Sequence, residues 1–190
     1  MNNQLQEFCE RWIAKARNLK GDDIKDQFDQ FFSLFVAYNR LYVEATLILN
    51  NRGDLNLNDN NPFPDKNAAT SYIVQYCGCR ELKNQLESES SFTEQLESLK
   101  NILRNHSFNI CLNPVTGNSN IPKDNTLLSK LESNNCNEKY TGILEFIYEV
   151  RCNMFHGRKS YEPIQELLLE PVIYFLYKIV DILFNKLQQE

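Results

Sequence analysis

The segment that most constrains the fold spans residues 145–159 and reads Glu145-Phe-Ile-Tyr-Glu-Val-Arg-Cys-Asn-Met-Phe-His-Gly-Arg-Lys159. Apolar residues recur in it and just before it at steps of four and three, the spacing of an amphipathic helix packed into a core; they are Ile143, Ile147, Val150 and Met154. Gly157 can adopt the left-handed backbone that ends a helix, and two positive charges, Arg158 and Lys159, follow it. The pattern predicts a helix that stops at Gly157 and leaves His156 on its last turn, next to solvent.

Three polar side chains near the end of this helix are candidates for chemistry. Arg151 and His156 are five residues apart, about 140° around an ideal helix, so they do not share one face. Asn153 and His156 are three residues apart and do share one. A guanidinium and an imidazole can still converge on a group held beyond the helix end, more easily if a second copy of the helix faces the first.

Arg151, four intervening residues and then His156 near a helix end resemble the signature of the HEPN superfamily of all-helical domains. The Phe-Ile-Tyr-Glu-Val lead-in, Asn153, the glycine after the histidine and the long apolar C-terminal segment strengthen the resemblance, which covers mainly residues 137–187. Residues 23–50 fit it more loosely. The resemblance implies an all-α fold, a HEPN-like helical bundle with a long central helix and a long C-terminal helix, forming a symmetric homodimer.

The same resemblance implies a metal-independent endoribonuclease that cuts single-stranded RNA or tRNA in antiviral defence or a toxin–antitoxin system. The RNA 2′-OH would attack the adjacent phosphate with no metal and no cofactor, leaving a 2′,3′-cyclic phosphate and a 5′-OH. Histidine titrates near neutrality, so His156 suits general acid–base work. Arg151 would bind phosphate oxygens, and Asn153 would orient the imidazole or the phosphate. Arg158 and Lys159 would bind the RNA backbone outside the cleft.

Two departures from the family pattern leave an alternative open. Cys152 stands directly after the arginine, where Asn, Asp or His is common, and Arg158 stands where some members carry a regulatory tyrosine. The alternative is a non-catalytic dimerising scaffold module of a defence or toxin–antitoxin complex, bound to an antitoxin or another partner protein. A third possibility is a substrate-binding helical domain that serves a separate nucleotidyltransferase.

Length and composition predict one domain over residues 1–190, because 190 residues with 42% apolar content can bury a sizeable core. The net charge of −5 counts modestly against a nucleic-acid binder, although a local basic patch would suffice. The N-terminus lacks the apolar run of a signal peptide, and residues 171–187 are too short and too charged to cross a membrane. We therefore expect a cytoplasmic protein that does not bind membranes.

Apolar spacing and cap residues place the remaining elements. They predict helices over residues 3–20, 23–50, 68–88, 93–105 and 126–132, and Asp22 and Asp23 can cap the second of these. Irregular loops are expected over residues 51–66 and 106–124, and residues 106–112 alternate briefly like a short strand. Cys77-Gly-Cys79 has no second pair beside it, so reduced structural thiols are expected rather than a zinc site.

Overall fold

The computed structural model describes residues 1–19, 23–58, 61–113, 115–155 and 165–190, and within these ranges the fold is all-helical. The predicted all-α class is therefore confirmed. In the described ranges the only β-type pairing is an isolated antiparallel bridge between Leu112 and Ser119. The short strand expected over residues 106–112 is wrong, because among the described residues its backbone pairs with another segment only at this single bridge.

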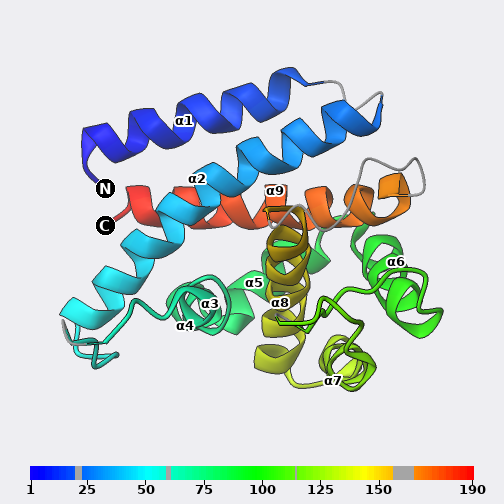
Figure 1. The fold of residues 1–190 in the computed structure, drawn as a ribbon. Helices are drawn as coiled ribbons and strands as arrows, with labels where there is room; N and C mark the ends of the chain where they lie inside the picture. Colours follow the sequence, from blue (N-terminus) through cyan, green and yellow to red (C-terminus); the bar gives the residue numbers. More distant parts are fainter. Residues whose placement is uncertain (20–22, 59–60, 114, 156–164) are drawn as a thin grey trace.

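The long central helix is α2 (Ile24–Asn51), which packs against α1 (Asn3–Asn18) and crosses α9 (Glu166–Gln188) in Figure 1. Its N-terminus is capped as predicted, because the Asp23 side chain accepts a hydrogen bond from the backbone N–H of Asp26. Apolar side chains cover two of its sides, and many of them are almost fully buried; these include Phe31, Leu34, Tyr38 and Leu41. A helix buried on two sides fixes the position of every element that packs against it.

The chain between residues 65 and 104 forms shorter helices than the spacing predicts. The helix expected over residues 68–88 is divided into α4 (Ser71–Cys77) and α5 (Cys79–Glu87). The short helix α3 (Asp65–Ala68) precedes them and begins within the loop expected over residues 51–66. One break lies at Gly78, whose φ of +84° is a conformation that L side chains rarely adopt. The next helix, α6 (Phe92–Arg104), matches its predicted range closely.

The segment that carries the motif is a pair of packed helices, α7 (Ile121–Glu132) and α8 (Cys136–Phe155). Helix α7 begins earlier than the expected loop 106–124 allows, because the Asn120 side chain caps it and Pro122 suits its first turn. In Figure 1 helix α8 runs transverse to α9, and its C-terminal end reaches α9. The predicted helix end at Gly157 lies outside the described residues.

Only α2, among the described residues, has the length and composition that would also allow it to cross a membrane. In its most apolar window 56% of the residues are buried inside the protein, as expected for the core helix of a bundle. The cytoplasmic location stays a prediction.

Helices α7 and α8 touch closely at Gly142, and this contact predicts an effect on stability. A Cβ at this position would lie 2.9 Å from Lys130 Cβ and 3.4 Å from the backbone nitrogen of Leu131. Overpacking costs about 1–3 kcal/mol, and replacing a helical glycine recovers at most about 1 kcal/mol. We expect Gly142→Ala to lower the free energy of unfolding in urea by about 1–2 kcal/mol. Asn137→Ala, at an exposed position of α8, is the control and should not lower it.

Candidate functional site

The candidate site lies at the C-terminal end of α8, where two of the predicted site residues are described. Arg151 and Asn153 belong to the last turn and a half of this helix. His156, Arg158 and Lys159 lie outside the described residues. The described part of the candidate site therefore consists of Arg151, Asn153 and the groups around them.

The Arg151 guanidinium packs against aromatic rings from two helices. Its central carbon lies 5.5 Å from the centre of the Phe35 ring of α2 and 5.7 Å from the centre of the Tyr148 ring of α8. Both distances are within cation–π range. Its Nη1 also lies 3.8 Å from the Cys152 sulfur. These contacts hold the half-buried side chain toward α2.

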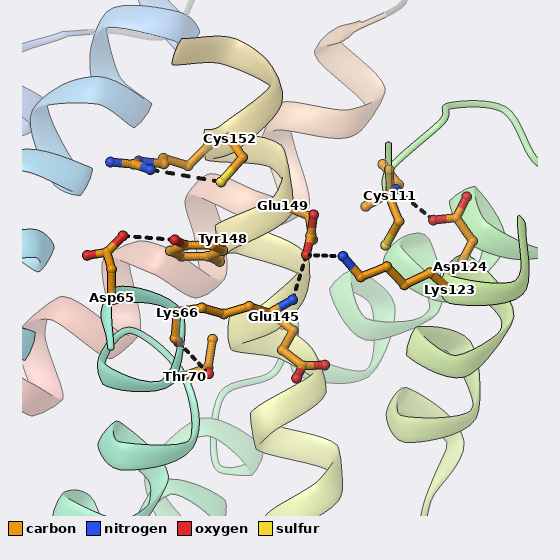
Figure 2. Close-up of polar contacts among 12 residues, drawn as sticks. Asp65, Lys66, Thr70, Cys111, Lys123, Asp124, Glu145, Tyr148, Glu149 and Cys152 are labelled. Atoms are coloured by element: carbon orange, nitrogen blue, oxygen red, sulfur yellow. Dashed lines mark hydrogen bonds and ion pairs between the residues drawn. The ribbon is translucent and has the colours of Figure 1, made fainter. Parts of the chain in front are cut away.

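Asp65 fixes the tyrosine beneath Arg151. Its Oδ1 accepts a hydrogen bond of 2.5 Å from the Tyr42 hydroxyl, and its Oδ2 accepts one of 2.8 Å from the Tyr148 hydroxyl. Figure 2 shows Asp65 and Tyr148 pointing toward one another. Burial, followed by the hydrogen bond to Asp65, raises the pKa of Tyr42 and of Tyr148 well above the ordinary value, while the Arg151 charge acts in the opposite direction. Both phenols therefore stay protonated and act as donors.

Asn153 contacts a different part of the protein. Its amide nitrogen donates a 2.8 Å hydrogen bond to the Ile110 carbonyl, and the residue is only 7% exposed. Residues two apart on a helix are separated by about 200°, so Arg151 and Asn153 face different neighbours. The structure does not bring these two predicted site residues together. It gives Asn153 a partner that ties residues 109–110 to α8, and its catalytic role stays a prediction.

A group of ion pairs that the sequence did not predict surrounds the preceding turns of α8. Glu149 Oε1 lies 2.7 Å from Lys66 Nζ of α3 and 3.1 Å from Lys123 Nζ of α7 (Figure 2). One turn earlier, Glu145 pairs with Lys130 of α7 at 2.7 Å. One sequence pattern could have pointed to these ion pairs: Glu145 and Glu149 are four residues apart, so both carboxylates lie on one face of the helix.

Nothing in the described ranges groups three or more potential metal ligands. The six cysteines are free thiols, as expected, and burial raises the pKa of Cys77 to about 12. The Cys136 thiol donates a 2.9 Å hydrogen bond to the backbone carbonyl of Cys79. These residues are 57 positions apart, so the sequence pattern around Cys79 does not predict this contact. A groove of about 500 Å³ beside the C-terminal end of α2 contains none of the predicted site residues.

Comparison of the chain with protein-family models, with curated proteins and with solved structures finds no match. The HEPN resemblance therefore depends on Arg151, His156 and the residues around them.

The buried phenol of Tyr42 predicts how stability changes at high pH. An unfolded tyrosine ionises near pH 10, whereas folded Tyr42 keeps its proton to higher pH. The unfolded state therefore binds fewer protons above pH 10, and stability falls as pH rises, by at most about 1.4 kcal/mol per pH unit for this group. We expect Tyr42→Phe to flatten this fall in urea unfolding between pH 9 and 11.5. Tyr72→Phe, outside the network, is the control; parallel curves for Tyr42→Phe and wild type would contradict the assignment.

Proposed function

We propose that this chain is a HEPN-type, metal-independent endoribonuclease that cuts single-stranded RNA or tRNA as a symmetric homodimer, in antiviral defence or a toxin–antitoxin system. The observation that carries the proposal is the position of Arg151. It lies at the end of a core helix with its guanidinium against Phe35 and Tyr148, and His156 follows four intervening residues later. A cation and an imidazole at this spacing suit phosphodiester cleavage.

The aromatic contacts suit Arg151 to a phosphate-binding role. A guanidinium packed on ring faces donates its N–H groups in its own plane, the geometry that matches two phosphate oxygens. Because Asp65 restrains Tyr148, the charge is held in a defined direction before the substrate binds. Preorganised charge of this kind stabilises the phosphorane at little cost in reorganisation.

The proposed reaction needs one proton acceptor and one proton donor. A base removes the proton of the 2′-OH, the 2′ oxygen bonds to phosphorus, and the bond from phosphorus to the 5′ oxygen breaks. An acid then protonates the leaving 5′ oxygen, which gives a 2′,3′-cyclic phosphate and a 5′-OH. Two copies of His156 in a homodimer would supply the base and the acid, while two copies of Arg151 would neutralise the developing charge.

The alternative proposal is a non-catalytic dimerising scaffold in the same kind of complex, and one observation favours it. Asn153 is buried and its amide is bonded to the Ile110 carbonyl, so this polar residue has a structural task. The enzyme and the scaffold differ in whether the folded dimer cleaves RNA.

Cleavage of labelled single-stranded RNA and tRNA in EDTA tests the proposal. We expect the wild type to cut and to leave a cyclic phosphate. His156→Ala should lower the rate about 10²–10⁴-fold, the usual contribution of a general acid or base, without changing dimerisation or the melting temperature. Arg151→Ala should also lower the cleavage rate strongly, and Arg151→Lys should restore it only in part, since lysine keeps the charge but lacks the planar fork of N–H donors.

The matched control is His106→Asn, which removes the other histidine of the chain. His106 is exposed and has a φ of +48°, a conformation that asparagine tolerates. We expect this variant to cleave at the wild-type rate. A folded wild-type dimer that cuts neither RNA would overturn the enzyme in favour of the scaffold.

A further inference from the structure

A small cavity lies between α3, α7 and α8, and charged side chains line most of it. Its volume is about 130 Å³, and its charged lining residues are Lys66, Lys123, Lys130, Glu145 and Glu149. In Figure 2 the Lys66 and Lys123 side chains reach toward the same Glu149 carboxylate from opposite sides. Three ammonium groups and two carboxylates leave one excess positive charge in the lining.

The carboxylates and the ammonium groups occupy different depths. The Glu149 side chain is 11% exposed, whereas Lys66 and Lys123 are 38% and 44% exposed. Both lysines bond to the same oxygen of Glu149, and each ammonium has three N–H donors. By contrast, Lys130 bonds to both oxygens of Glu145. The excess positive charge is therefore concentrated on the Lys66 and Lys123 ammonium groups, at the solvent side of the buried Glu149.

The two ammonium groups at the opening of the cavity favour a negatively charged ligand. A cation at the opening would meet two ammonium groups, and an apolar group would remove them from water without replacing their hydrogen bonds. A phosphate offers several oxygens that accept from both lysines at once, and lysine binds phosphate as a point charge. The chemistry of the lining therefore fits a phosphate group.

We infer that the Lys66 and Lys123 ammonium groups at the opening of this cavity, above Glu149, form a phosphate-binding site. Resting on the proposed function, the ligand is a backbone phosphate of the bound RNA. Glu149 lies only two residues before Arg151 on α8, so one helix carries the candidate cleavage group and a second phosphate contact. Free phosphate shares this chemistry, and the experiment has to separate the two sources.

The test measures binding of a 2′-O-methyl RNA oligonucleotide, which lacks the attacking hydroxyl, by fluorescence anisotropy over a range of salt concentrations. We expect the Lys66→Gln, Lys123→Gln double variant to bind at least about threefold more weakly. The slope of log affinity against log salt concentration should become shallower by about 0.7. This is the change expected when one contact to a phosphate of a single-stranded nucleic acid is lost. The control is Lys178→Gln, because Lys178 pairs with Glu89 on a different surface and is similarly exposed; it should bind as the wild type does.

Glu149→Gln separates a ligand site from a purely structural ion cluster. It removes a negative charge and leaves both lysines, so a phosphate site should bind the oligonucleotide about threefold or more tightly. A structural cluster would show a lower melting temperature with unchanged or weaker binding, and that result would overturn the inference. If Glu149→Gln does not fold, Lys123→Gln alone, at a 44% exposed side chain, gives the decisive comparison.

Inorganic phosphate distinguishes the two sources of ligand. A rise in the wild-type melting temperature with phosphate at constant ionic strength, absent in the double variant, supports the site itself. If phosphate stabilises the protein but the oligonucleotide binds no better to wild type than to the double variant, RNA as the ligand is overturned. Neither readout requires cleavage, so an inactive protein that binds the oligonucleotide at these lysines would overturn the proposed ribonuclease and leave the phosphate site intact.

Discussion

The burial of α2 on two sides is the constraint from which the rest of the arrangement follows. Helices α1 and α9 cover it, and its tyrosines carry hydroxyl groups into an interior that would otherwise leave them unpaired. Tyr38 donates to the Ala69 carbonyl at 2.5 Å, and Tyr42 donates to Asp65. These two bonds hold both ends of α3 against the central helix. The candidate site is then built on that fixed segment.

Asp65 links this core to the motif helix. One carboxylate accepts from a tyrosine of α2 and from a tyrosine of α8, so it joins three helices at one point. The next residue, Lys66, reaches Glu149 on another face of α8. The direction of Arg151 and the ion pairs around Glu149 thus depend on the same short helix, α3. A change in α3 would alter both sides of α8 together.

Features that depend on residues close together in the sequence, such as helix caps and helix lengths, could be predicted. Contacts between residues far apart in the sequence could not. The cap at Asp23 and the length of α2 follow from local spacing, and the structure agrees with both. Lys66 and Glu149 are 83 residues apart, and Lys123 and Glu149 are 26 apart, so no local pattern reveals their contact. The division at Gly78 was missed because a glycine interrupts a helical pattern without changing its spacing. Asn153 was placed on the correct helix, but its partner Ile110 is 43 residues away.

The net charge of −5 would weaken binding of RNA to the proposed phosphate site at Lys66 and Lys123. The long-range field of the whole protein repels a polyanion, so attraction has to come from cations close to the bound strand. Exposed ammonium groups act within about a Debye length, 8 Å at physiological salt, and salt weakens them. Binding by one chain would then be weak, and a symmetric dimer would double the number of local contacts. Dependence on a second copy would also give a cell control over cleavage, because activity would rise more steeply than protein concentration.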